Sequence, residues 1–281
     1  MKFSLIMCTI GRTEEVTTAV NSIVKQSYQN YELIIVDQNV DNNLETILKD
    51  YIYHNNIIYI RSNIKGLSRN RNLGLKMATG SIIAFPDDDC EYPINTLETI
   101  DNLFKKRANL DFITINIKDT KTDRYFIKEH DNRKFNKYNF KPYAISIGIF
   151  IKYKKLDDVT FDESLGAGTY FGAAEESDLI SKLIDLNYAG KYYGSYYVLH
   201  PIDVQHLPYL KIINRYKSYN LGFGALMKKE IILRKKYMFL FLFILQLLGR
   251  FIGCVILIKK RKLLWISFIY QIKGYLEYKI K

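Results

Sequence analysis

Short apolar runs alternate with segments of helical periodicity through the first 90 residues, and this alternation constrains the fold more than any other feature. The apolar runs predict buried strands, and they cover residues 3–8, 31–37, 57–60 and 81–85. The segments between them predict helices that begin near Thr13, Asn43 and Gly66. Strands that alternate with helices favour a doubly wound parallel sheet. No Gly-x-Gly-x-x-Gly follows the first strand, which disfavours the usual dinucleotide-binding fold.

The chain up to about residue 200 is expected to continue this pattern. Helices are expected at residues 95–106 and 175–186, and strands at residues 110–117, 144–151 and 196–201. Residues 118–142 are polar and predict a variable loop region or short hairpin. Residues 165–172 form a glycine-rich loop just before the second of these helices.

Three consecutive carboxylates follow the apolar run that ends at residue 85. Pro86 cannot continue a hydrogen-bonded ladder, and Asp87, Asp88 and Asp89 come next. Open α/β sheets bind ligands beyond the carboxyl ends of their strands. Three carboxylates repel one another unless a cation lies among them, and hard divalent cations prefer oxygen ligands. The alternative is a solvated acidic turn, but the preceding buried strand favours a site for Mn²⁺ or Mg²⁺.

The positive charge of the chain is concentrated in its C-terminal quarter. The whole chain has a net charge of +12, from 41 Lys and Arg against 29 Asp and Glu. Residues 211–281 hold 16 basic and 2 acidic residues, a net of +14, which leaves −2 for residues 1–210. The basic residues flank apolar runs, and this pattern favours an anionic membrane surface over nucleic acid as a partner.

The first of these apolar runs, residues 237–258, is long enough to span a bilayer. Arg250 lies near its middle, and a charge at that depth is costly in lipid. We therefore expect residues 210–281 to form helices that lie in, or partly enter, the membrane surface. A spanning helix and a buried helical hairpin are the alternatives. Residues 1–209 are expected to form the catalytic domain.

The cysteines and the N-terminal residues indicate the cellular compartment in which the protein works. Cys8, Cys90 and Cys254 are odd in number and far apart, which favours a reducing compartment without a disulfide framework. The apolar run at residues 3–8 is too short for a signal peptide and is expected to be the first strand. We therefore expect the protein at the cytoplasmic face of the cell membrane, in contact with the inner-membrane surface.

Several stretches together resemble the family-2 glycosyltransferases, which have the GT-A fold, and above all their bacterial members that build surface polysaccharides. The matching stretches are residues 4–9, 33–37, 66–74, 85–89 and 172–179. Each is weak by itself, but their order and spacing over about 200 residues are specific. Residues 219–226 and Lys228 are similar to a segment that follows the domain in such enzymes. The resemblance implies a mostly parallel GT-A sheet flanked by helices, a nucleotide-diphosphate sugar donor and a divalent cation, Mn²⁺ or Mg²⁺.

The resemblance also implies roles for residues that bind the donor and the metal. The donor-binding set comprises Thr9, Asp37, Arg69, Arg71, Asp87, Asp88, Gly166 and Gly168. Arg71 matches the arginine of the family pattern and Arg69 could take its place, while the two glycines would lie near the sugar or acceptor. The metal would be held by Asp89 with help from His200, and His206 is a weaker substitute for His200.

The catalytic base implied by the resemblance is Glu176. It stands where the family commonly has the second residue of a Glu-Asp pair, although Glu replaces Asp here. Glu175 competes for the role, and Asp178 is expected to cap the helix or to pair locally.

These features predict a metal-dependent, inverting glycosyltransferase that acts on a hydroxyl of a glycan or lipid-linked acceptor. A single carboxylate base opposite a phosphate leaving group suits a single displacement, which inverts the configuration at the sugar carbon. The sequence does not exclude a retaining mechanism. One alternative is a sugar-1-phosphate nucleotidyltransferase, which would usually have a glycine-rich basic loop where residues 9–13 stand. The other is a noncatalytic membrane-binding or nucleic-acid-binding protein, which gives no reason for the carboxylates at residues 87–89 and 175–176.

Overall fold

The computed structural model describes residues 1–53, 56–128, 131–154, 156–201 and 208–280. The chain divides into two compact units. The first unit contains Met1–Lys65, Arg69–Phe161 and Leu179–Asp203, and the second contains Gly66–Ser68, Asp162–Asp178 and Val204–Lys281. Two helices, α4 (Leu67–Leu75) and α7 (Glu175–Asp185), contribute residues to both units.

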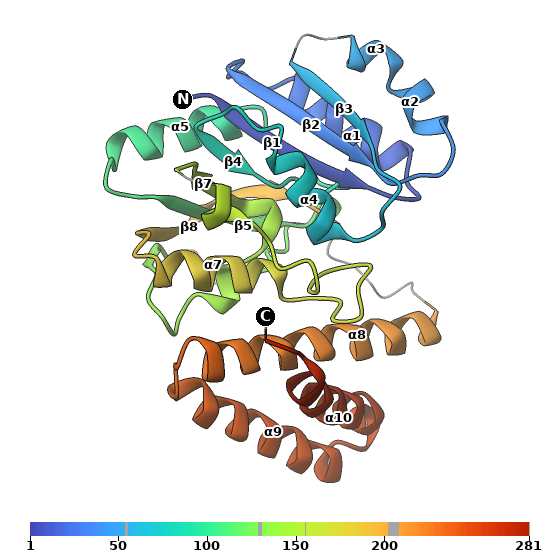
Figure 1. Cartoon of the computed structure of the whole chain (residues 1–281), viewed down its shortest axis with the longest axis vertical. Coiled ribbons are helices and arrows are strands. Elements are labelled where there is room, and N and C mark those ends of the chain that lie inside the picture. The colour runs from blue at the N-terminus through green and yellow to red at the C-terminus, as the bar shows by residue number, and fades with distance from the viewer. Residues whose placement is uncertain (54–55, 129–130, 155, 202–207, 281) are drawn as a thin grey trace. The chain divides into compact units, whose positions relative to one another are not determined.

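The first unit is built on a sheet that has eight strands within the described residues (Figure 1). Its strands are β1 (Phe3–Thr9), β2 (Tyr31–Asp37), β3 (Ile57–Arg61), β4 (Ile82–Ala84), β5 (Phe112–Lys118), β6 (Arg133–Lys134), β7 (Ile149–Lys152) and β8 (Gly190–Leu199). Their order across the sheet is β3-β2-β1-β4-β7-β5-β8-β6. β7 and β6 are antiparallel to their neighbours, and the other strands run parallel to one another. This mostly parallel sheet confirms the fold class expected from the sequence.

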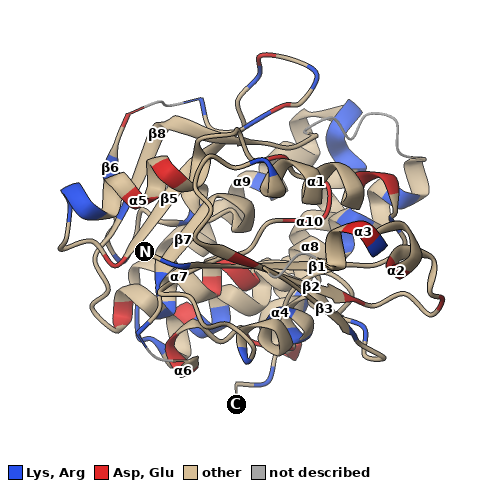
Figure 2. Ribbon diagram, turned by 90° about the horizontal axis from the view of Figure 1, so that it is seen from above, with Lys and Arg blue, Asp and Glu red and all other residues tan. Residues whose placement is uncertain are grey.

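The central strands are buried on both faces, which explains why their sequences are continuous apolar runs. The helices of this unit include α1 (Glu14–Val24), α2 (Asn43–Ile47), α3 (Lys49–Ile52), α5 (Thr96–Lys106) and α6 (Leu156–Val159). Leu5 of β1 shares a core cluster with Val16 of α1 and Leu97 of α5. Its neighbour Ile6 faces the other way, where a Cβ at Gly74 of α4 would lie 2.5 Å from its Cγ2 atom. β1 and β4 carry no charged side chain, and β1 is tan in Figure 2.

Two strands differ from the expectation. The strand expected at residues 144–151 is confined to β7, because Gly148 and the residues before it form the 3-10 turns η1 (Lys141–Tyr143) and η2 (Ser146–Gly148). β8 begins six residues earlier than expected, because pairing with β5 extends it. Ile115 pairs with Tyr193 but Asn116 pairs with Tyr197, so three residues of β8 form a bulge between these pairs.

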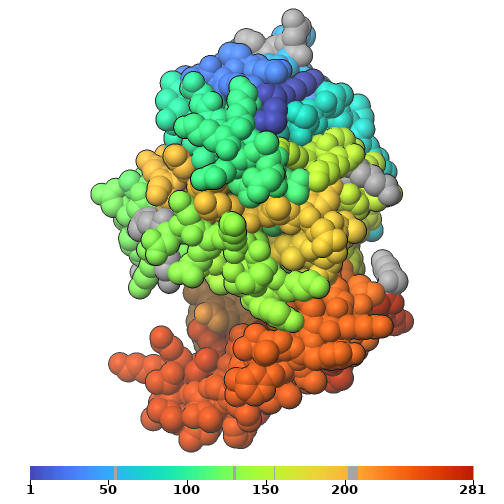
Figure 3. All heavy atoms as spheres, turned by 90° about the vertical axis from the view of Figure 1, so that its left-hand side faces the viewer, coloured from blue at the N-terminus to red at the C-terminus, as the bar shows by residue number. Residues whose placement is uncertain are grey.

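The second unit contains the helical C-terminal region, drawn in orange and red in Figure 3. Its elements are α8 (Tyr209–Lys228), the π-helical turn η3 (Lys229–Leu233), α9 (Met238–Ile256), the 3-10 turn η4 (Ile258–Lys260) and α10 (Arg261–Glu277). A Cβ at Gly224 would lie 2.1 Å from Gln271 O, and one at Gly274 would lie 2.1 Å from Leu221 O. α8 and α10 therefore pack backbone to backbone. In the described part of the chain, α9 alone is long and apolar enough to cross a membrane, and 17% of it is buried.

Candidate active site

The carboxyl ends of β1, β2 and β4 lie at one edge of the sheet. Thr9 and Asp37, the last residues of β1 and β2, are direct partners in the parallel register. β4 pairs with β1 on its other side, and the chain then leaves the sheet toward Asp87, Asp88 and Asp89. The ligand-binding edge of an open α/β sheet therefore carries five of the residues expected to bind the donor or the metal.

Asp87, Asp89 and His200 form a group of potential metal ligands at this edge. One possible ligand atom from each residue lies within 4.8 Å of the others. His200 directly follows β8, and its Nε2 atom lies 3.2 Å from Asp89 Oδ1. Two carboxylates suit Mg²⁺ or Mn²⁺, and the imidazole adds a nitrogen ligand that a transition metal accepts, so the residues fit a divalent cation. His206, the weaker substitute, lies outside the described residues.

Arg12 is an additional charged residue at this edge that the sequence reasoning missed. It contacts Asp88, and its Nη2 atom lies 2.8 Å from Asp89 Oδ2. Burial would raise the pKa of Asp89, but His200 and Arg12 outweigh it and lower this pKa. Burial would lower the pKa of His200, but the hydrogen bond and charge of Asp89 raise it. The available signal was the position of Arg12 in the turn that directly follows the first strand.

Arg71 lies against Asp87, with its guanidinium inside the protein. Its Nη2 atom donates to Asp87 Oδ1 at 2.9 Å, although the Arg71 side chain is only 1% exposed. The guanidinium carbon lies 5.7 Å from the ring centre of Phe85 and 5.4 Å from that of Phe161. Burial raises the pKa of Asp87, and Arg71 opposes this shift. The structure thus places Arg71 where it holds Asp87, whereas Arg69 is exposed.

Asp37 is fully buried at the end of β2. Its Oδ2 atom accepts a hydrogen bond from the Tyr59 hydroxyl at 2.5 Å, and its Oδ1 atom accepts one from the Asn39 amide at 2.8 Å. Burial and this hydrogen bond raise the pKa of Tyr59. Each carboxylate oxygen can accept a second hydrogen bond, so a nucleotide contact through Asp37 would add to these two bonds. Nothing in the sequence marks Tyr59 as part of the site beyond its place in the third strand.

Gly166 and Gly168 lie in the loop of the second unit, and their backbones explain why glycine is needed there. Their φ angles are +99° and +82°, in the left-handed region that glycine tolerates best. A Cβ at Gly166 would lie 2.7 Å from Ser68 Oγ and 3.0 Å from Glu175 Cδ. The loop therefore packs closely on the first turn of α7.

The predicted base and its competitor begin α7, directly after Ala174, which has a φ of +76°. Glu175 is buried, and Glu176 is partly exposed. The expectation of a local partner for Asp178 is wrong, because its Oδ2 atom accepts from Lys229 Nζ at 2.7 Å, 51 residues away in the sequence. A partner so distant in sequence leaves no local signal.

The sheet order and the acidic edge define a GT-A type α/β fold, and the comparisons with known proteins agree. The family model described as "Glycosyl transferase family 2" matches residues 4–162. The chain belongs to this family, as its motifs led us to expect. The match ends at Asp162, so Glu175, Glu176, His200 and the helical tail lie beyond it.

Known relatives include one protein of Bacillus subtilis and one of Staphylococcus aureus. The chain is 31% identical over 200 residues to the minor teichoic acid biosynthesis protein GgaB of Bacillus subtilis. The aligned region covers 65% of this chain and 21% of that protein. It is 32% identical over 116 residues to the poly(ribitol-phosphate) β-N-acetylglucosaminyltransferase TarP of Staphylococcus aureus, covering 40% of this chain and 35% of that protein. The chain spans between about a fifth and two fifths of the length of the first curated relatives it matches.

A solved structure with the same fold is that of S. aureus TarS, residues 1–349, in complex with UDP-GlcNAc. It superimposes with a TM-score of 0.57 at 19% sequence identity, covering 79% of this chain and 66% of that one. At this identity the likeness establishes the fold.

Proposed function

We propose that the protein is a metal-dependent, inverting glycosyltransferase that moves a sugar from a nucleoside diphosphate to a hydroxyl of a glycan or lipid-linked acceptor in surface polysaccharide synthesis. The observation that carries this proposal is the convergence of Asp87, Asp89 and His200 at the ligand-binding edge of a family-2 sheet. The names of relatives that act in teichoic acid synthesis or on poly(ribitol phosphate) support the acceptor class.

Asp89, Asp87 and His200 would hold the divalent cation, Mn²⁺ or Mg²⁺. Bound there, the cation would neutralise charge on the diphosphate leaving group as a Lewis acid. In the structure Arg12 and His200 both contact the Asp89 carboxylate. The guanidinium of Arg12 therefore lies where the negative charge of a diphosphate would be. Arg71 keeps the Asp87 carboxylate in place from inside the protein.

The donor nucleotide would bind along the same edge. Thr9 and Asp37 stand at the ends of adjacent strands, where hydrogen-bonding groups can select base and ribose. Asp88 is held by Arg12, and Arg69, which is exposed, would meet a phosphate of the donor. The complex of TarS with UDP-GlcNAc makes UDP the first nucleotide to test.

Glu176 would remove the proton from the acceptor hydroxyl as the attacking oxygen bonds to the sugar carbon. Its place in the first turn of α7 favours the carboxylate form, which a base requires. Glu175 is the buried neighbour, and successive helical side chains point about 100° apart, so one of the two can face the acceptor. Gly166 and Gly168 would let backbone approach the sugar or the acceptor.

The helical tail would hold the enzyme on the cytoplasmic face of the cell membrane. Much of the apolar surface of α9 is exposed, and it includes a stripe formed by Phe241, Ile244, Leu248, Ile252 and Val255. Spacings of three and four residues put these side chains on one face of the helix. The basic residues 259–262 follow directly, and they suit anionic lipid headgroups.

Thermal shift with nucleotides, measured with and without Mn²⁺, tests the proposal. A stabilisation by UDP or another nucleoside diphosphate that requires Mn²⁺ is expected, because a ligand that binds the native state raises its melting temperature. Turnover of a panel of nucleotide sugars then identifies the donor. Stabilisation by nucleoside triphosphate together with sugar 1-phosphate would instead indicate a nucleotidyltransferase, and no response to any nucleotide would indicate a noncatalytic protein.

A further inference from the structure

The segment Asp162–Asp178 belongs to the same compact unit as the C-terminal helices. It runs through Gly166 and Gly168 to Glu175 and Glu176, so it carries the proposed base. Ser68 Oγ donates to Leu165 O at 2.6 Å and fixes one part of the loop. The other contacts described below come from the helical tail, whose proposed role so far is attachment to a membrane.

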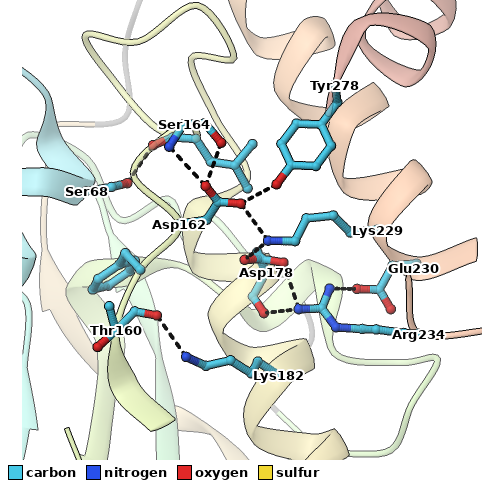
Figure 4. A network of polar contacts seen from close by, with 12 residues as sticks. Ser68, Thr160, Asp162, Ser164, Asp178, Lys182, Lys229, Glu230, Arg234 and Tyr278 are labelled. Atoms are coloured by element: carbon cyan, nitrogen blue, oxygen red, sulfur yellow. Dashed lines mark hydrogen bonds and ion pairs between the residues drawn. The ribbon is translucent and has the colours of Figure 1, made fainter. Parts of the chain in front are cut away.

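Lys229 joins the two ends of this segment (Figure 4). Its Nζ atom lies 2.7 Å from Asp162 Oδ2 and 2.7 Å from Asp178 Oδ2. The three side chains are 9%, 14% and 6% exposed, in the order Lys229, Asp162 and Asp178. Asp162 is the first residue of the segment and Asp178 is the last, so one buried ammonium group closes the segment into a loop.

Two further residues of the tail hold the same carboxylates. Arg234 Nη2 lies 2.8 Å from Asp178 Oδ1, and Arg234 Nη1 lies 2.7 Å from Glu230 Oε1. The Tyr278 hydroxyl donates to Asp162 Oδ2. Figure 4 shows these groups converging on the two aspartates from η3 and from the end of the chain. The ion pairs are buried, so salt in solution screens them little.

α8 also packs directly against the backbone that precedes Glu175. A Cβ at Gly222 would lie 2.3 Å from Ala173 O, so only glycine allows this approach. Gly224, two residues on and about 200° around the helix, makes the equally close approach to Gln271 of α10. The glycine-containing stretch at residues 219–226, noted in the sequence, thus places α8 between α10 and the segment that carries the proposed base.

We infer that Lys229 is a positioning residue for the proposed base, and that the C-terminal helices are needed for turnover as well as for membrane attachment. The inference rests on the proposed function of Glu176. Without the ammonium group, Asp178 would keep Arg234 and Asp162 would keep the Tyr278 hydroxyl, but no ammonium would lie between the two buried carboxylates to offset their repulsion. The ends of the segment would then separate, and the first turn of α7 would shift.

The expected kinetic signature follows from where the contacts lie. A general base acts only within hydrogen-bond reach of its proton, and a misplacement of about 1 Å can cost on the order of 100-fold in rate. The proposed metal ligands Asp87, Asp89 and His200 belong to the first unit, so nucleotide binding with Mn²⁺ should persist. Loss of Lys229 should therefore lower kcat and leave the affinity for UDP unchanged.

The experiment compares Lys229→Met, Lys229→Arg and Lys228→Met in the full chain. Lys228 is the matched control, because it is the adjacent lysine and its Nζ donates to Leu276 O and Tyr278 O instead of to carboxylates of the segment. We expect kcat to fall on the order of 100-fold in Lys229→Met, with partial recovery in Lys229→Arg and a small effect in Lys228→Met. The dissociation constant for UDP with Mn²⁺, measured by calorimetry, should not change. Wild-type kcat in Lys229→Met, or equal losses in Lys229→Met and Lys228→Met, would overturn the inference.

Amide hydrogen exchange supplies a readout that does not depend on turnover. In Lys229→Met, exchange should rise in residues 162–178 and stay unchanged around β1 and β4. If the wild-type chain transfers no sugar but this local rise is seen, Lys229 holds the segment and the proposed function is what fails. Should Lys229→Met not fold, Asp162→Asn replaces one of the two carboxylates that Lys229 contacts by a group of the same shape, and unchanged exchange and kcat in that variant would overturn the inference.

Discussion

Arg71 donates a hydrogen bond to Asp87 at 2.9 Å from a side chain that is 1% exposed, so one of the proposed metal ligands is held from inside the protein. Removing one partner of a fully buried pair typically costs about 3 kcal/mol or more, and the 33% exposure of the Asp87 side chain reduces this to about 2 kcal/mol. We expect Arg71→Met to lower the free energy of unfolding by about this amount, measured by urea denaturation. Arg69→Met, at an exposed position, should change it by about 0.5 kcal/mol or less. Equal stability of the two variants would contradict the role given to Arg71.

Asp89→Asn should weaken the binding of UDP in the presence of Mn²⁺ while the fold survives. The reason is that Asp89 is the carboxylate on which His200 and Arg12 converge, and the amide is a poorer ligand for a hard cation. Calorimetric titration with UDP, with and without Mn²⁺, measures the effect, and the titration without metal is the internal control. Undiminished metal-dependent affinity in this variant would remove Asp89 from the metal site.

Glu176→Gln should lower turnover by about 10²–10⁴-fold, because that is the usual contribution of a general base. Donor affinity should persist, and Glu175→Gln should have a smaller effect. Initial rates at saturating donor provide the measurement. If Glu175→Gln loses turnover and Glu176→Gln does not, the base is Glu175, and two active variants would exclude both residues from the role.

The full chain should sediment with liposomes that contain anionic lipid, and neutralising residues 259–262 with glutamine should reduce this binding. Each basic residue near an anionic surface contributes about 1 kcal/mol. This variant is a better test than a chain that ends near residue 202, because shortening the chain would also remove the contacts of Lys229 and Tyr278 to Asp162. Liposomes of neutral lipid are the control, and equal binding to both kinds would argue against the electrostatic part of the attachment.

The lowered pKa of the Glu32 carboxyl group predicts how the stability of the protein depends on pH. Its carboxylate accepts hydrogen bonds from Lys2, Ser4 and Thr79, and although burial opposes them, they lower its pKa to about 2. A folded-state pKa below the unfolded value of about 4.3 stabilises the protein above pH ~4.3, and the contribution disappears as pH falls toward 2. Glu32→Gln should therefore lower the free energy of unfolding by up to about 3 kcal/mol at pH 7 and change it little at pH 2. Denaturant unfolding at several pH values measures this, and a constant difference would contradict it.

The sheet and its acidic edge could be predicted because their causes are local in sequence. Continuous apolar runs specify buried parallel strands, and parallel strands bring their carboxyl ends to one edge, so Thr9, Asp37 and Asp87 could be placed there before any coordinates. His200 was harder to place, since its approach to Asp89 depends on how β8 pairs with β5. No local pattern carries that information.

The ion pairs of the tail could not be predicted for a related reason. Asp178 looks like an ordinary acidic residue in the first turn of a helix, and Lys229 looks like one basic residue among many. Their contact joins positions 51 residues apart, and it depends on the π-helical turn that begins at Lys229. Such a turn arises from packing and has no sequence signature of its own.

The bulge in β8 has a consequence for how relatives of this chain should be aligned. Residues 194–196 lie between the pairs made by Tyr193 and Tyr197, and a strand rises about 3.3 Å per residue. In a relative that keeps these three residues but pairs without the bulge, position 197 would lie in the place of His200, and the residue at position 200 would lie about 10 Å further along the strand. A gap drawn here therefore changes which residue is compared with this histidine. Alignments made for family-2 chains are best checked at this point by counting residues from the strand partner instead of by matching letters.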